Sequence, residues 1–254
     1  LLFIADLHYA LKQFDWVVAQ ASSFDAVIIG GDLLDLSAPL ELDVQIVVIE
    51  KYLNRIAARV PVIVCSGNHD LDFKSPPFES EARWLQGLRS DRIYVDGNRL
   101  EQDGTVITIC AWWDGPQARA ALEAQLARDD QVPKKRWIWI HHAPPDQSPV
   151  SWAGRKFGGD EFLVERILQY QPDIVLSGHI HNAPFYPDGS WIDRLGRTWV
   201  FNPGRQIGPN PAFIIIDLEQ MSAEWSSLEG HSVRPLQGEA TESLTAPAPS
   251  AGGA

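Results

Sequence analysis

The chain has 254 residues, 45% of them hydrophobic, and 21 basic residues stand against 33 acidic ones for a formal net charge of -12. This length and apolar content favour one large core over two domains, and so acidic a surface disfavours broad binding to nucleic-acid backbones. No apolar run reaches the roughly 18 residues that a membrane-spanning helix needs. The two cysteines, Cys65 and Cys110, lie in apolar runs, which predicts buried thiols in a reducing compartment.

Short β-rich runs alternate with longer helical patterns along the chain. The runs typical of strands are Leu1–Ala5, Ala26–Ile29, Val62–Cys65, Val106–Ala111, Trp137–Ile140, Asp173–Leu176, Thr198–Phe201 and Ala212–Asp217. The patterns typical of helices lie near Phe14–Ser22, Pro39–Arg59, Glu79–Arg89, Gln117–Arg128 and Asp160–Tyr170. This alternation predicts an α/β sandwich with largely parallel central strands. Strands dominate after about residue 190, which predicts a second sheet or an antiparallel edge.

The chain shows no internal repeat and no linker that divides it, so residues 1–238 are predicted to form one domain. Residues 239–254 are rich in Ala, Pro, Ser, Thr and Gly and are predicted to form a disordered tail. The only methionine is Met221, so the given chain lacks its start and a removed targeting segment would be invisible. The expected location is the cytoplasm.

Polar motifs follow five of the predicted strands. In chain order they are Asp6-Leu7-His8, Gly30-Gly31-Asp32-Leu33-Leu34-Asp35, Ser66-Gly67-Asn68-His69-Asp70, His141-His142-Ala143-Pro144-Pro145 and Ser177-Gly178-His179-Ile180-His181. Only His231 of the seven histidines lies outside these motifs. Because ligands of open α/β sheets bind beyond the carboxyl ends of the strands, the motifs are expected to meet at one edge of the fold.

The residue types in these motifs favour metal binding. Imidazole, carboxylate and amide oxygen suit Mn, Fe, Zn, Co or Ni, whereas an all-thiolate site needs more than two cysteines. A pair of metals requires a bridging anion, which an aspartate supplies. In Asp-x-His and His-x-His, alternate residues of an extended segment point the same way, so both side chains can face one site.

The five motifs, in this order over residues 6–181, resemble those of the calcineurin-like metallophosphoesterase superfamily: Asp-x-His, Gly-Asp-x-x-Asp, Gly-Asn-His-Asp, a His near a Pro, and Gly-His-x-His. Asn202-Pro203-Gly204 also resembles a turn that many members carry beyond the last metal motif. The resemblance implies an α/β fold of four layers, α/β/β/α, with two mixed sheets. It also implies a site for two divalent transition-metal ions.

Carried over by position, the resemblance implies that Asp6, His8 and His181 hold the first metal and that Asp32 bridges both. Asn68 and His179 would hold the second metal together with one histidine of the pair His141 and His142. Counting from the end of the strand favours His141, whereas a His-x-Pro pattern favours His142; we prefer His141 and retain both.

The remaining motif residues resemble catalytic and supporting ones. His69 would donate a proton to the leaving oxygen or stabilise the charge of the phosphoryl group, and Asp70 would orient His69 by accepting its other N–H. Asp35 is expected to support the bridging loop. Whether Trp112, Trp113 or Arg205 contacts the substrate stays open.

The function implied is hydrolysis of a phosphodiester, or less readily a phosphomonoester, by attack of a metal-bound hydroxide. A small substrate is expected, with no membrane partner. Alternatives are a nuclease-type member that acts on nucleic acid, a catalytically silent scaffold on the same fold, and a metal or redox module without hydrolysis. The oligomeric state stays open.

Overall fold

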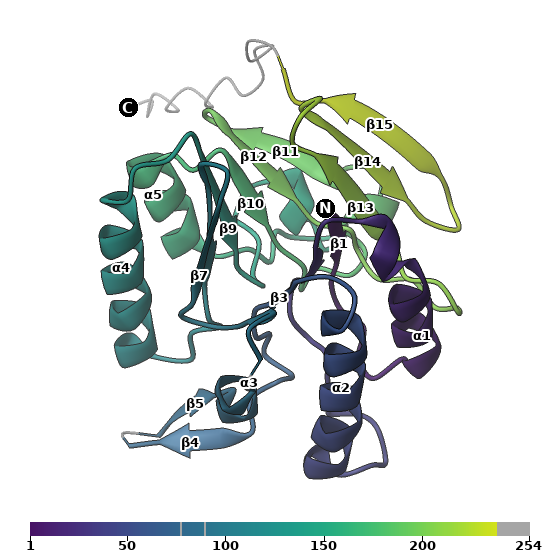
Figure 1. Cartoon of the computed structure of the whole chain (residues 1–254). Coiled ribbons are helices and arrows are strands. Elements are labelled where there is room, and N and C mark those ends of the chain that lie inside the picture. Colours follow the sequence, from purple (N-terminus) through teal and green to yellow (C-terminus); the bar gives the residue numbers. More distant parts are fainter. Residues whose placement is uncertain (77, 89, 238–254) are drawn as a thin grey trace, which may run out of the picture.

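Two β-sheets lie face to face, with helices on their outer sides, in the computed structural model of the chain (Figure 1). The structure describes residues 1–76, 78–88 and 90–237. The predicted tail, residues 239–254, lies outside the described residues.

The first sheet has seven strands in the order β15-β14-β13-β1-β2-β3-β6. Its strands β1, β2, β3 and β6 are parallel, and β13 joins β1 antiparallel and continues into the β14 and β15 hairpins. The bounds are β1 Leu2–Ile4, β2 Val27–Ile29, β3 Val62–Val64, β6 Ile93–Tyr94, β13 Phe213–Asp217, β14 Ser222–Ser226 and β15 His231–Pro235.

The second sheet has six strands in the order β11-β12-β10-β9-β8-β7. Its central strands β8, β9, β10 and β12 are parallel, and the edge strands β7 and β11 are antiparallel to their neighbours. The bounds are β7 Arg99–Gln102, β8 Thr105–Ile109, β9 Arg136–Ile140, β10 Ile174–Leu176, β11 Ile192–Leu195 and β12 Thr198–Phe201.

Helices cover the outer face of each sheet. On the first sheet they are α1 Leu11–Gln20, α2 Leu42–Ala57 and the short α3 Arg83–Gly87, and on the second they are α4 Pro116–Asp130 and α5 Glu161–Tyr170. Short 3-10 helices occur at Ala21–Ser23, Pro149–Ser151 and Ala183–Phe185, and a separate hairpin joins β4 Phe73–Ser75 to β5 Glu79–Glu81.

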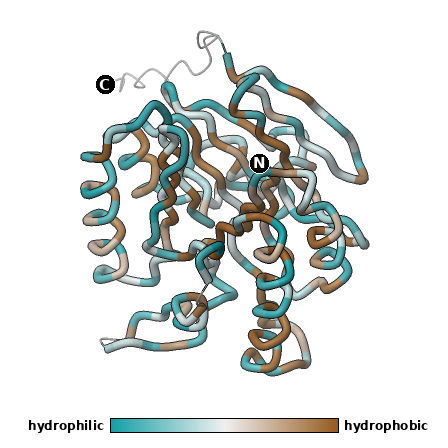
Figure 2. The backbone as a smooth tube through the Cα atoms, viewed as in Figure 1, coloured by the Kyte–Doolittle hydropathy of each residue, from teal (hydrophilic) through white to brown (hydrophobic). Residues whose placement is uncertain are grey.

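Alternation along the strands explains the four layers. In β1, Leu2 and Ile4 pack against α1 and α2, whereas Phe3 points the other way into the core between the sheets. In β9, Trp139 faces α4 and α5 while Ile140 faces the first sheet. Figure 2 shows hydrophobic residues concentrated in these central strands. The fold is therefore the predicted α/β/β/α sandwich.

The eight predicted strands all correspond to observed ones, with ends that agree to within two residues. The buried Cys65 and Cys110 thiols are also confirmed. The helix predicted near Glu79–Arg89 is wrong at its start, because Glu79–Glu81 pairs with β4 and only Arg83–Gly87 is helical. In the described part of the chain, no helix has the length and apolar character needed to cross a membrane.

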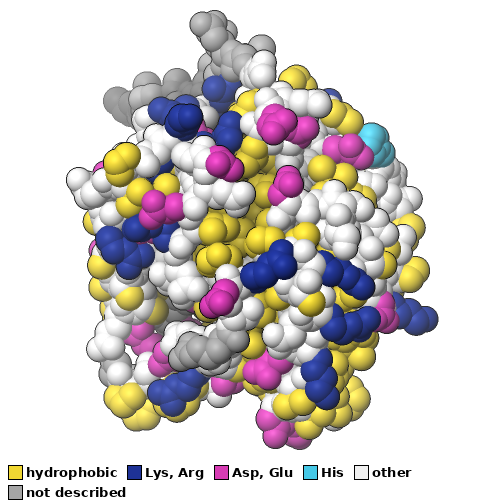
Figure 3. All heavy atoms as spheres, in the orientation of Figure 1, with side chains coloured by type: hydrophobic (Ala, Val, Ile, Leu, Met, Phe, Trp, Pro, Cys, Tyr) yellow, Lys and Arg dark blue, Asp and Glu magenta, His cyan; other side chains and the backbone are white. Residues whose placement is uncertain are grey.

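The two ends of the sandwich differ. A cavity of about 610 Å3 lies where several strands begin, lined by Leu1, Ala26, Thr105 and Arg136 among others. On the face drawn in Figure 3, apolar side chains gather near the centre, with acidic and basic side chains around them. The polar motifs follow the opposite, carboxyl ends of the strands.

Candidate metal centre

The motif loops are joined to one another by backbone hydrogen bonds at the carboxyl ends of the strands. The N–H groups of Asp6 and His8, after β1, donate to the carbonyls of Gly31 and Asp32, after β2, at 3.1 and 2.9 Å. Three of these residues, Asp6, His8 and Asp32, have positive φ values of 57°, 40° and 54°. Non-glycine residues hold such conformations only where the surroundings enforce them, and these cluster at functional sites.

A first group of four side chains comprises Asp6, His8, Asp32 and His181, whose ligand atoms lie within 4.8 Å of one another. The Nε2 atoms of His8 and His181 are 3.0 Å apart, and Nε2 of His181 is 3.3 Å from Oδ1 of Asp6. Nε2 of His8 is 3.5 Å from Oδ2 of Asp32. Two carboxylates and two imidazoles thus converge from three separate loops.

A second group shares Asp32 with the first and adds His142 and His179. Nε2 of His142 lies 3.2 Å from Oδ2 of Asp32. Nδ1 of His142 is 2.6 Å from the carbonyl of Gly30, which makes Nδ1 the donor and leaves Nε2 free to bind a metal. Asp32 lies between two groups of donors, as a bridging ligand must.

The structure includes His142 in the site and leaves His141 outside it. The N–H of His141 still donates to the carbonyl of Leu176, so strand pairing continues past the end of β9. Because side chains alternate, His141 lies on the same side as Trp139, toward the helices, and His142 on the side of Ile140, between the sheets. The preference for His141 counted strand residues without this alternation, and the geometry favours His142.

Asn68 lies on the loop after β3, whose neighbouring residues contact Asp32. Its neighbour His69 donates its N–H to Oδ1 of Asp32 at 2.9 Å, and a side chain at Gly67 would collide with the Asp32 carboxylate. The Oδ1 atom of Asn68 is buried and has no hydrogen-bond partner among the described residues. A buried carbonyl oxygen without a partner is costly, so its position beside Asp32 fits a metal ligand.

The half-buried His69 imidazole lies at the edge of the first group, with its ring centre 4.6 Å from that of His8. Leu36 N–H lies 3.4 Å from His69 Nδ1, a long hydrogen bond at an exposed position. His69 is thus close enough to the donor groups to contact a substrate that binds there.

Asp70 does not orient His69 as predicted. Its carboxylate is fully buried and accepts hydrogen bonds of 2.8–3.0 Å from the backbone N–H groups of Asp32, Leu33, Leu34 and Gly67. Burial and the neighbouring Asp32 raise the pKa of Asp70 to about 7, against the effect of these backbone donors. Both oxygens accept from the backbone around Asp32, so Asp70 holds the loop that carries Asp32 in place.

Electrostatics set the protonation state of the donors. Burial by itself raises the pKa values of Asp6 and Asp32, but neighbouring imidazoles outweigh it and hold both below the ordinary range. Burial lowers the pKa values of His8 and His179 to about 4. For His142 burial also lowers the pKa, but Asp32 outweighs burial and raises it to about 10. At neutral pH His142 must therefore lose a proton before it can bind a metal.

Asn202 fixes the His179 loop, a role that the sequence motif did not specify. Its fully buried side chain donates to the carbonyls of Val150, Gly178 and Ile180 at 3.0–3.1 Å. Its oxygen accepts the N–H of Gly204 at 2.8 Å. The Asn-Pro-Gly turn thereby anchors the backbone on both sides of His179.

A second supporting network lies under the loop after β3. The buried Asp96 accepts the N–H of Ser66 at 2.9 Å, and the hydroxyl of Ser66 accepts the N–H of Trp112 at 2.9 Å. The half-buried Trp112 ring centre lies 5.7 and 5.3 Å from those of His142 and His179. Trp112 therefore borders the site. No sequence pattern marks Asp96, because its partners are distant in the chain.

Trp113 lies apart from the donors. Its indole N–H donates to Asp160 at 2.8 Å, and its ring packs against Phe162. This is a structural role at the start of α5.

The donor set fits metal ions by its own chemistry. Besides the unpaired Oδ1 of Asn68, the buried Nε2 of His142 faces the Asp32 carboxylate at 3.2 Å. Carboxylates, imidazoles and an amide oxygen are the ligands of Mn, Fe, Zn and related ions.

Comparison with known proteins finds a phosphoesterase family and a viral relative that are similar to this chain. The sequence model of the calcineurin-like phosphoesterase family matches residues 1–183. The putative phosphoesterase 078R of Invertebrate iridescent virus 3 is 28% identical over 261 residues, covering 90% of this chain and 69% of that protein.

Solved structures share the fold at low sequence identity. TT1561 of Thermus thermophilus is 16% identical with a TM-score of 0.58, covering 93% of this chain and 98% of that one. The purple acid phosphatase PPD1 of yellow lupin is 15% identical with a TM-score of 0.56, and the match covers 92% of this chain and 51% of that one. A dimetal phosphatase from Danio rerio is 12% identical with a TM-score of 0.53, and the match covers 88% of this chain and 94% of that one.

Proposed function

Because the chain belongs to the calcineurin-like phosphoesterase family, whose model matches residues 1–183, we propose that this metal-dependent phosphoesterase uses two divalent transition-metal ions to hydrolyse a small phosphodiester. The observation that carries the proposal is the pair of donor groups that share Asp32. A shared carboxylate between two sets of imidazoles is the arrangement that a two-metal site requires.

In this proposal Asp6, His8 and His181 would hold the first metal, Asn68, His142 and His179 would hold the second, and Asp32 would serve both. The chemistry that such metals would supply is an activated water and neutralisation of the negative phosphoryl oxygens.

His69 acts as the general acid in this proposal. Its imidazole is half-buried and lies beside His8. Its ring contacts the N–H of Leu36, whereas the Asp70 carboxylate accepts from backbone N–H groups. His69 therefore has an accessible imidazole with which to donate a proton to the leaving oxygen. Asp70 acts indirectly, since its four backbone hydrogen bonds hold the loop that carries Asp32.

The charge of the chain supports a small substrate. A net charge of -12 repels an extended phosphate backbone, which disfavours the nuclease alternative. The catalytically silent scaffold is disfavoured because it needs neither the strained donor loops nor the buried, unpaired Oδ1 atom of Asn68.

A substrate panel tests the proposal. Purified protein with added Mn is offered bis-p-nitrophenyl phosphate, p-nitrophenyl phosphate, cyclic nucleotides and pyrophosphates. We expect hydrolysis, fastest for a diester, and the absence of any hydrolysis would favour the scaffold.

His69→Asn separates general acid catalysis from metal binding. Turnover should fall by roughly 100- to 10,000-fold while the metal content stays the same. His231→Asn is the matched control, because His231 is exposed and pairs with Glu224 on the neighbouring strand. Loss of metal from the His69→Asn protein would show that His69 is a ligand instead.

A further inference from the structure

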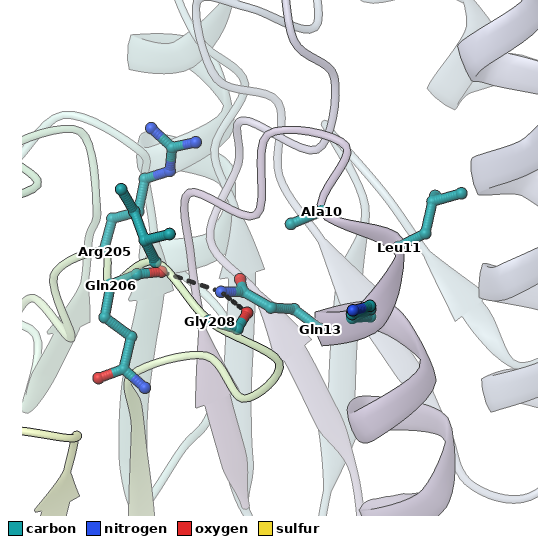
Figure 4. Close-up of a pocket in the computed structure, with 8 residues that line it drawn as sticks. Ala10, Leu11, Gln13, Arg205, Gln206 and Gly208 are labelled. Atoms are coloured by element: carbon teal, nitrogen blue, oxygen red, sulfur yellow. Dashed lines mark hydrogen bonds between the residues drawn. The ribbon is translucent and has the colours of Figure 1, made fainter.

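A second cavity, of about 220 Å3, opens beside the metal centre. Figure 4 shows the loop with Arg205, Gln206 and Gly208 on one side of it, and Ala10 and the start of α1 on the other. Both walls continue directly from the donor groups: Ala10 is two residues beyond His8, and the N–H of Arg205 donates to the carbonyl of His181 at 2.9 Å.

The two walls are held together by a buried side chain. Gln13 of α1 is 3% exposed, and its amide nitrogen donates to the carbonyls of Gln206 and Gly208 at 2.9 and 3.2 Å (Figure 4). Gly204 fixes the start of the loop, since it has a φ of 70° and a side chain there would crowd the His181 carbonyl. Arg205 is therefore placed by a defined backbone path.

The cavity is positive and lacks a counter-charge. The Arg205 guanidinium is half-buried and forms no hydrogen bond or ion pair with the described residues, and the exposed Lys12 lines the same cavity. None of the lining residues is acidic, nor does the first turn of α1 carry an acid. In so acidic a protein, a half-buried arginine without a partner at a cavity indicates an anionic ligand.

The size and position of the cavity narrow the range of possible ligands. Its volume is below the roughly 300 Å3 at which pockets for whole drug-sized ligands begin, so it suits one compact group. Because the backbone of Arg205 is bonded to that of His181, a member of the first donor group, the cavity adjoins that group. One substrate can thus place a reacting phosphate at the donors and another anionic group here.

We propose that this cavity binds a second phosphate of the substrate through Arg205 and Lys12, so that the preferred substrates carry two phosphates in close succession. The proposal rests on the proposed phosphoesterase function, since it assigns the first phosphate to the metal centre. Arg205 would bind through its planar guanidinium, which matches phosphate oxygens in pairs, and Lys12 would add charge at the rim.

Binding of a matched ligand pair tests this proposal without relying on turnover. Mn-loaded protein is titrated calorimetrically with AMP and with α,β-methylene-ADP, which has a second phosphate and cannot be hydrolysed at its bridging carbon. Both ligands are supplied at the same free Mn concentration. We expect the diphosphate to bind about tenfold more tightly, the value of one charge-assisted contact.

Three variants test which side chains cause the preference for the diphosphate. Arg205→Gln should remove most of the preference for the diphosphate, and Lys12→Gln, at an exposed position that does not risk the fold, should reduce it. Arg234→Gln is the matched loss of charge on the exposed edge strand β15 and should keep the preference.

Equal affinity of the unmodified protein for the two ligands, or an unchanged preference in both the Arg205 and Lys12 variants, would overturn the proposal. A different result, the absence of hydrolysis across the substrate panel, would overturn the proposed function. The calorimetric comparison measures binding alone, so it can still be interpreted in that case.

Discussion

Replacing Asn202 by alanine should destabilise the fold and loosen the metal centre together. The Asn202 amide serves the carbonyls of Val150, Gly178 and Ile180, and its oxygen accepts the Gly204 N–H. The Gly178 and Ile180 carbonyls each accept another backbone hydrogen bond, so the loss is greatest at Gly204 and Val150. Two buried groups at roughly 1–3 kcal/mol each give a loss of about 4 kcal/mol in unfolding free energy.

Urea unfolding of the metal-free protein measures this loss, and calorimetric titration with Mn measures the consequence for binding. Because Gly178 and Ile180 flank His179, we expect weaker binding at the second metal position. Asn202→Asp keeps the shape and the acceptor for Gly204 but turns an oxygen toward three carbonyls, so it should destabilise at least as much.

The matched control is Asn54→Ala, which removes an exposed amide that bonds only to its own helix. Since alanine favours helix, this change should alter the unfolding free energy by less than about 0.5 kcal/mol. If Asn202→Ala costs under about 1 kcal/mol and leaves Mn affinity unchanged, the assigned anchoring of the His179 loop is refuted.

Two further predictions concern His142. Asp32 outweighs burial and raises the pKa of His142 to about 10, so a metal that binds His142 at neutral pH must displace its proton. The affinity for Mn should therefore rise about tenfold per pH unit between pH 7 and 9. Asp32 has a lowered pKa and is already ionised in this range, so it adds nothing to this pH dependence. A pH-independent dissociation constant would contradict this. Gly31→Ala should disrupt Mn binding because its φ is 90° and the new Cβ would lie 2.5 Å from His142 Nδ1. Gly97→Ala, with a φ of 78° and open space around it, isolates the backbone strain and should keep Mn binding; similar loss in both would refute the collision.

The central strands could be predicted because their residues are buried on both faces. Val27–Ile29 and Ile174–Leu176 are continuous apolar runs bounded by turn residues, and that pattern permits few other structures. The motifs at their ends then locate the site. The edge strand Arg99–Gln102 and the strand Ser222–Ser226 were missed because they mix polar and apolar residues and form by pairing with their neighbours.

The segment near residue 80 shows why a helical pattern can fail. Glu79 is in a strand because its buried carboxylate accepts the N–H groups of Gln117 and Ala118 at 2.8 Å each, at the start of α4. This contact joins residues nearly 40 positions apart, and it outweighs local helix propensity. The role of Asp70 was missed for the same reason, since its donors at Asp32, Leu33 and Leu34 are distant in sequence.

The rate of bis-p-nitrophenyl phosphate hydrolysis, measured as Mn is added stepwise to metal-free protein, tests the two-metal account most directly. We predict that the rate rises until about two equivalents of Mn per chain are bound and then stays constant. Asp32→Ala, which removes the carboxylate shared by both donor groups, should show no such rise. A rate that saturates at one equivalent, or hydrolysis retained by Asp32→Ala, would contradict the account.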